Sequence, residues 1–221
     1  MIRSRPVLGS LLLSTCLATS ARGAEQAHFT LTADQVAAAI ERGLRDPGAE
    51  PGLVLQDRGQ AWAKRIMPNS AGTGRGFSIV VYTPTTWVAK IAAQAELEGE
   101  RLTPEAIEPE MLEPLLRVVA YPDLPTSPMA DGAFGTASVE SVVLRDEAKR
   151  STVEPVDSEP FDQTDPSGLR TYQGLMAAFR LEELERIRSA SRNREFYVTV
   201  TGTTGETKNF KIKKEFHPAL P

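Results

Sequence analysis

The side chains that most often carry out catalysis are scarce in this sequence. Of its 221 residues only His28 and His217 are histidines, and both lie near the ends of the chain. The single cysteine, Cys16, lies in an apolar N-terminal stretch. A serine or cysteine nucleophile normally needs a neighbouring base, and the sequence has neither a Gly-x-Ser-x-Gly turn nor a His-Glu-x-x-His zinc helix. We therefore expect no enzymatic activity, no catalytic or metal-binding residue and no cofactor.

A run of carboxylates offers a different chemistry, because hard oxygen atoms are ligands for calcium. The run lies in a Pro-rich stretch and comprises Glu154, Asp157, Glu159, Asp162 and Asp165. Its spacing matches no calcium-binding loop, so we interpret it as a solvent-exposed acidic loop without a metal. Two carboxylates that hydrolyse a glycosidic bond are assembled in space and leave no local signature, so a carboxylate-based hydrolase is the enzymatic alternative.

Two further groups of residues bear on binding. Gly72, Gly74 and Gly76 precede an alternating apolar segment, whereas a phosphate-binding loop follows a strand and opens a helix, so we expect an ordinary loop there. The last predicted strand carries four lysines opposite Phe210 and Ile212: Lys208, Lys211, Lys213 and Lys214. Lysines on an edge strand prevent sheet-to-sheet aggregation. Their alternative role is to bind an anionic lipid or polymer.

The first 23 residues have the layout of a secretory signal peptide. Arg3 and Arg5 precede an apolar stretch over 7–18, and small residues follow at Ala21 and Gly23. A membrane-spanning helix needs about 20 apolar residues, so this shorter stretch is expected to target the chain and to be removed. We predict cleavage after Gly23, with cleavage after Ala21 as the rival. The mature chain is then periplasmic or secreted and has no transmembrane segment.

The signal region also affects the chemistry of the mature chain. Leu13–Cys16 is similar to a bacterial lipoprotein signal, so acylation of Cys16 is an alternative, although Thr15 stands where such signals usually have Gly or Ala. Without residues 1–23 the chain has 22 basic and 29 acidic residues, a net charge of −7, and no cysteine. We therefore expect a core without disulfides, and the negative charge disfavours a nucleic-acid partner.

Residues 24–74 are predicted to hold a short helix and a linker. Thr32 and Gln35 fit a capping box, and apolar residues then recur at helical spacing until Pro47. The helix is therefore expected over 33–45. The rest of the segment is expected to be a connection that contains one turn or strand.

From Gly76 onward the pattern predicts mostly strands. Alternating apolar side chains or short apolar runs lie at 77–82, 115–121, 139–144, 152–156, 172–180, 195–201 and 208–213. A second helix is predicted over 85–98 because Pro84 suits its first turn, and a short helix is predicted over 181–188. The spacing of Trp87 on the second helix predicts a core residue rather than a residue that stacks on a ligand.

These elements predict a mainly β (α+β) fold, an antiparallel β-sandwich of about seven strands with an inserted helix. The sandwich domain is expected over 75–216, after the helical N-terminal segment, with a tail at 217–221. Gly202 and Gly205 suit a hairpin turn between the last two strands. One shared core should contain Phe77, Val118, Val143, Phe179, Val198 and Phe210.

Five short segments together carry a resemblance. They are Phe77-Ser-Ile-Val-Val-Tyr-Thr-Pro84, Leu116-Arg-Val-Val with Pro122-Asp123, Val142-Val-Leu-Arg145, Phe196-Tyr-Val-Thr-Val200 and Phe210-Lys-Ile-Lys213. They resemble uncharacterised exported bacterial proteins whose second half is an immunoglobulin-like β-sandwich. The resemblance covers about residues 76–214 and implies that fold. Its motifs are strands rather than chemistry, so it implies no functional residue.

We therefore expect an exported, non-enzymatic module of the bacterial cell envelope or extracellular space that binds a partner protein or stabilises an assembly. The expected partner is another envelope or extracellular protein. One alternative is a surface lipoprotein, or a module that binds lipid or an anionic polymer, using Cys16 or the lysines of the last strand. The other alternative is the carboxylate-based hydrolase.

Mass spectrometry of the mature N-terminus tests the predicted signal peptide. We expect a chain that begins at Ala24, because Ala21 and Gly23 supply the small side chains that signal peptidase requires. A chain that begins with an acylated Cys16 would show a lipoprotein instead. An exported chain that still begins at Met1 would contradict cleavage altogether.

Overall fold

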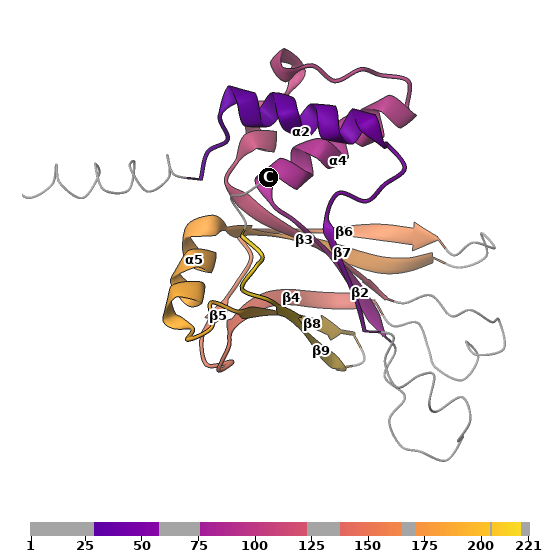
Figure 1. Cartoon of the computed structure of the whole chain (residues 1–221). Helices are drawn as coiled ribbons and strands as arrows, with labels where there is room; N and C mark the ends of the chain where they lie inside the picture. The colour runs from indigo at the N-terminus through magenta and orange to yellow at the C-terminus, as the bar shows by residue number, and fades with distance from the viewer. Residues whose placement is uncertain (1–28, 58–75, 123–137, 165–170, 204, 218–221) are drawn as a thin grey trace, which may run out of the picture.

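The helices and strands form three layers in the computed structural model, which describes residues 29–57, 76–122, 138–164, 171–203 and 205–217 (Figure 1). Two helices, α2 (Ala33–Arg45) and α4 (Pro84–Leu97), lie on one side of a five-stranded sheet. A four-stranded sheet packs against the other side, and α5 (Leu181–Ala190) lies at one end of the two sheets. This architecture confirms the predicted mainly β (α+β) sandwich.

Both sheets are antiparallel. The five-stranded sheet has the order β1-β2-β3-β7-β6, with strands at Leu53–Asp57, Phe77–Tyr82, Leu115–Pro122, Thr171–Arg180 and Asp157–Thr164. The four-stranded sheet has the order β5-β4-β8-β9, with strands at Thr152–Val153, Val139–Asp146, Phe196–Gly202 and Thr207–Ile212. Two 3-10 turns, η1 (Pro104–Ala106) and η2 (Pro109–Leu112), connect α4 to β3. Two strands, β1 and β6, are additional to the seven predicted.

Alternate side chains of both sheets fill one apolar interior. Phe77 and Phe179 of the larger sheet and Phe196 of the smaller sheet are fully buried in it. Residues of α5, among them Leu184, close one end of this interior. Five of the six predicted core residues lie in it: Phe77, Val118, Phe179, Val198 and Phe210. The prediction of a single shared core is therefore confirmed for these five.

The prediction was wrong for Val143, which is half-buried on the outer face of the smaller sheet. Its neighbours Val142 and Leu144 point into the core instead. Simple alternation from buried Val139 places residue 143 inside, but the pairing of β4 with β8 shifts register between Val139 and Ser141. An irregularity of this kind adds one residue to a strand, so every later side chain changes face.

The acidic stretch that we predicted to be a loop forms strand β6. It pairs with β7 along its whole length, from Asp157 opposite Ala178 to Thr164 opposite Thr171. Its position at the edge of the sheet explains how a strand can contain Pro160, because the outer side of an edge strand needs no hydrogen-bond partner. The composition predicted a loop because it is rich in Pro and Asp, which are depleted in strands on average.

Each helix of the outer layer begins with a capping box, of which the one at Thr32 was predicted. Thr32 with Gln35 and Thr83 with Thr86 form capping boxes at the starts of α2 and α4. The helices pack so closely that a Cβ atom at Gly43 would lie 2.2 Å from the carbonyl oxygen of an α4 residue. No helix in the described part of the chain combines the length and the apolar character that crossing a membrane requires.

Two adjacent substitutions test which face of β4 points inward. Leu144→Ala should lower the free energy of unfolding by about 2–5 kcal/mol, because it leaves a cavity in the shared interior. Val143→Ala should lower it by about 1 kcal/mol or less, because that side chain is only half-buried on the outer face. Urea denaturation of both variants measures the difference. A larger loss for Val143→Ala than for Leu144→Ala would contradict the observed register.

Candidate functional site

A row of polar side chains crosses the outer face of the four-stranded sheet. Arg145 of β4 lies opposite Tyr197 of β8, and Tyr197 lies opposite Lys211 of β9. The next residues of these strands, among them Leu144 and Val198, point into the core, so the row faces away from it. Lys149, from the turn between β4 and β5, adds a second lysine: its Nζ lies 4.9 Å from the centre of the Tyr197 ring. We call Arg145, Lys149, Tyr197 and Lys211 the cationic platform.

Lys149 reaches the Tyr197 ring because its turn has an unusual backbone. Its φ is +57°, a left-handed conformation that costs a residue with a side chain about 1–2 kcal/mol. The carboxylate of Asp146 supports the turn by accepting hydrogen bonds from the backbone N–H groups of Arg150, at 2.6 Å, and Ser151, at 3.2 Å. The surrounding structure therefore holds Lys149 in place against local strain.

Glu147 joins this turn to a second one, between α5 and β8. Its carboxylate accepts hydrogen bonds from Ser191 Oγ at 2.8 Å, Asn193 Nδ2 at 2.6 Å and the Asn193 backbone N–H at 3.4 Å. The second turn contains Arg194, whose φ is +55°. These are the two positive-φ residues other than glycine in the described part of the chain. One carboxylate therefore connects two strained turns.

A buried arginine of α5, Arg188, also contacts the second turn. Arg188 of α5 is 1% exposed, and burial lowers the pKa of its guanidinium. Its Nη1 lies 3.2 Å from the carboxylate of Glu185, and its Nε donates to the backbone carbonyl of Arg194 at 3.4 Å. Glu185 also pairs with the side chain of Arg194. The backbone of the second turn is thus held by α5 on one side and by Glu147 on the other.

The charges around the platform are mostly positive. Residues 145–151, 192–197 and 211–214 together hold eight basic and three acidic residues. Lys211 contacts the carboxylate of Glu195 at 2.7 Å, which raises the pKa of Lys211. Five other cations nearby form no ion pair with a described residue: Arg145, Arg150, Arg192, Lys213 and Lys214. The platform can therefore attract an anionic partner and stack a flat or apolar group on Tyr197.

Trp87 belongs to a different cluster, between α4 and the larger sheet. Its ring lies 5.4 Å from that of Tyr82 in an edge-to-face arrangement, and the guanidinium of Arg117 lies 5.0 Å from it. Burial, followed by the charge and hydrogen bond of Glu50, raises the pKa of Tyr82. Glu50 also pairs with Lys90 of α4 at 3.2 Å. Trp87 is half-buried outside both apolar clusters, so its predicted core position was wrong, and the cluster attaches helix to sheet.

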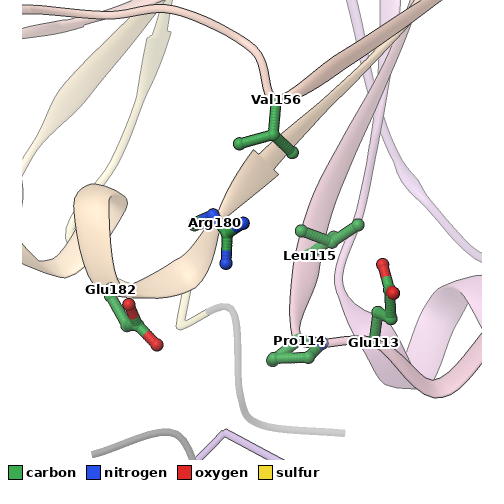
Figure 2. A pocket seen from close by; sticks show the side chains of 6 residues that line it. All are labelled: Glu113, Pro114, Leu115, Val156, Arg180 and Glu182. Atoms are coloured by element: carbon green, nitrogen blue, oxygen red, sulfur yellow. The ribbon is translucent and has the colours of Figure 1, made fainter. Parts of the chain in front are cut away.

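A small pocket opens where β7 passes into α5 (Figure 2). Its volume is about 170 Å³, and Arg180 stands in it with Glu113 and Glu182 on either side. Pro114, Leu115 and Val156 complete its wall. Two carboxylates beside one guanidinium leave no net attraction for an anion, and pockets for drug-sized ligands are about 300 Å³ or larger. We therefore rank this pocket below the platform.

The structure disperses the acidic residues that the sequence singled out. Glu154, Asp157, Glu159 and Asp162 are exposed on or next to the edge strand β6, and Asp165 lies outside the described residues. Within the described ranges no three residues of the types His, Cys, Asp and Glu are grouped to hold a metal ion. His28, Cys16, Gly72 and Gly74 lie outside those ranges, Gly76 is buried before β2, and His217 is half-buried.

The lysines of the last strand divide between two faces. Sheet order confirms that β9 is an edge strand. Lys208 lies on the same face as Phe210, because the two are two residues apart, so the prediction that it shares a face with Lys211 was wrong. Lys213 and Lys214 lie beyond the last residue of β9.

Sequence reasoning missed three platform residues, Arg145, Lys149 and Tyr197. Asp146 at the start of a polar run was a usable turn signal, because its carboxylate can accept from backbone N–H groups further along the chain. No local pattern shows that this turn meets the end of α5.

The pH dependence of stability tests the role of Glu147. Hydrogen bonds from Ser191 and Asn193 lower the pKa of the Glu147 carboxyl, so its charged form stabilises the fold at neutral pH. This contribution is present above the ordinary glutamate pKa and is lost as the pH falls through the lowered value. Glu147→Gln should therefore unfold at a lower temperature than the original chain at pH 7, and the two melting temperatures should converge below about pH 4.

The matched control is Glu154→Gln, which neutralises an exposed carboxylate that has no ion pair with a described residue. This variant should melt like the original chain at both pH values. Equal melting temperatures for Glu147→Gln and the original chain at pH 7 would show that the carboxylate does not hold the two turns.

Comparison with known proteins gives no family. No family model and no curated protein matches this sequence. Among solved structures, a DUF4426 family protein from Pseudomonas aeruginosa is similar over 66% of this chain and 90% of its own, with 11% sequence identity and a TM-score of 0.27. A likeness this distant assigns neither a family nor a function.

Proposed function

We propose that this chain is an exported, non-enzymatic protein of the bacterial cell envelope or extracellular space, and that it works as a protein-interaction or structural module through the cationic platform. The proposal joins the signal peptide expected over residues 1–23 to the surface at Arg145, Lys149, Tyr197 and Lys211. It includes an immunoglobulin-like arrangement of the sandwich, as the sequence resemblance implies.

The observation that carries the proposal is the strained backbone at Lys149. A left-handed residue with a side chain is retained when the surrounding structure imposes it, and such residues concentrate at functional sites. Glycine would relieve the strain at Lys149 and keep the turn. Lysine instead brings a cation over Tyr197, which supports a role for this side chain in binding.

Two platform residues, Arg145 and Tyr197, are of types that are common at protein contact surfaces. Tyrosine and arginine are enriched where proteins bind one another, because both offer a large contact area together with hydrogen-bond donors. Tyr197 lies between two cations across the sheet, with half-buried Val143 on the same outer face. An apolar centre surrounded by charges favours a partner that has an apolar contact of its own within an acidic surface.

A second candidate function is binding to an anionic lipid or polymer. The exposed pair Lys213 and Lys214 favours it, because neither lysine forms an ion pair with a described residue. Two adjacent cations attract any anionic surface through long-range forces. Half-buried Val143 and Tyr197 on the platform face argue for the protein partner, because a surface of anionic groups alone offers them no matching apolar contact.

Photo-crosslinking in the cell envelope tests the proposed function. Tyr197 is replaced by the photoreactive residue p-benzoylphenylalanine, which keeps an aromatic ring at the centre of the platform. We expect a crosslinked product of defined mass, and we expect Lys149→Glu to reduce its yield about tenfold, because the substitution reverses the charge beside the ring.

The matched control places the same photoreactive residue at Phe161, a half-buried aromatic residue of β6 in the other sheet. It should give no such product. Equal crosslinking from both positions, or none from position 197, would contradict the platform as the contact surface.

A further inference from the structure

Opposite charges are separated between the outer layers of the molecule. The cationic platform lies on the four-stranded sheet, whereas residues 96–113 belong to the helical layer on the far side of the five-stranded sheet (Figure 1). Those residues hold seven glutamates and one arginine. The platform region, which comprises residues 145–151, 192–197 and 211–214, holds eight basic and three acidic residues. The platform region is therefore positive, whereas the helical layer on the far side carries much of the negative charge of this acidic protein.

The glutamates of the helical layer are available for a partner. Six of them are exposed and form no ion pair with a described residue: Glu96, Glu98, Glu100, Glu105, Glu108 and Glu110. We call residues 96–110 the acidic segment. The cations around the platform that form no ion pair with a described residue could pair with these glutamates. Within one molecule they cannot meet, because the two sheets lie between the two surfaces.

Each surface also has an apolar contact. Leu97 lies within the acidic segment and is 70% exposed, the largest exposed fraction among the described large apolar side chains. Tyr197 and Val143 are half-buried on the face that carries the platform. Burial of a leucine against a tyrosine ring, surrounded by opposite charges, matches the usual plan of a protein interface, with an apolar centre and a polar rim.

We infer that the partner of the cationic platform is the acidic segment of a second copy of this chain, so that copies associate head to tail. This inference rests on the proposed function and names its partner. The two surfaces lie on opposite layers of the molecule. Two copies can therefore form one contact between a platform and an acidic segment, and the second platform and the second segment stay free for further copies. The contact is heterologous and adds copies one after another instead of closing as a dimer.

Sedimentation analysis with charge-reversed variants tests this inference. In about 20 mM salt the average mass of the original chain should rise continuously with concentration, and in about 500 mM salt the chain should be monomeric, because salt screens the contact. Lys149→Glu with Arg150→Glu should weaken association at least about tenfold, and so should Glu96→Lys with Glu100→Lys. An equimolar mixture of these two double variants should associate again, because the unchanged platform of one variant can bind the unchanged acidic segment of the other.

The matched control is Glu154→Lys with Glu159→Lys, two exposed residues on or next to the edge strand β6 that change the net charge as much as the acidic-segment variant does. This variant should associate as the original chain does. Folding of every variant is checked by its melting temperature in about 500 mM salt, where the contact is screened. A platform variant that does not fold is replaced by Lys149→Gln with Arg150→Gln.

Three results would overturn the inference: a monomer at every concentration in low salt, a mass that stops rising at a dimer, or no restoration in the mixture. Vesicles of phosphatidylglycerol are tested in parallel. A monomeric chain that binds these vesicles through Lys149 and Arg150 would replace the second copy by a lipid surface. A monomeric chain whose position 197 crosslinks to another envelope protein would refute self-association and leave the proposed function in place.

Discussion

Burial of alternate side chains between two sheets is the constraint on which the rest of the structure depends. Once Leu144, Val198 and Phe210 are turned into a common interior, their strand neighbours must face outward. Cross-strand pairing then places Arg145, Tyr197 and Lys211 in one row. The platform is therefore a consequence of the core, and a shift of one residue in the register of β4 would move its arginine inside.

The same fold stabilises two strained turns and determines in which direction the charged surfaces face. Glu147 and Arg188 hold two turns in backbone conformations that their residues would not adopt alone. The buried apolar interior supplies the free energy that keeps this strain in place. Because the helices and the four-stranded sheet lie on opposite sides of the five-stranded sheet, their unlike charges point in opposite directions. Such a molecule is suited to directional association.

The helices and most strands were predictable because their signals are local. The capping box at Thr32 and the hairpin turn with Gly205, whose φ is +83°, depend on residues a few positions apart. Strand β6 was missed because its edge position decides that Pro160 is tolerated, and an edge is defined by neighbouring strands. Of the platform only Lys211 was singled out, since Tyr197 had no chemical motif and its partner Lys149 is 48 positions away.

By itself the sequence determined the class of fold, the inward face of most strands and the shortage of residues for nucleophilic catalysis, because these follow from composition and from periods of two or 3.6 residues. Tertiary structure alone decided which turns meet, and on which side of the two sheets the cations of the platform and the glutamates of the acidic segment lie. Those properties arise from contacts between residues far apart in the chain, such as Glu147 with Ser191 and Asn193. No local period encodes such contacts, because packing of whole elements brings them together.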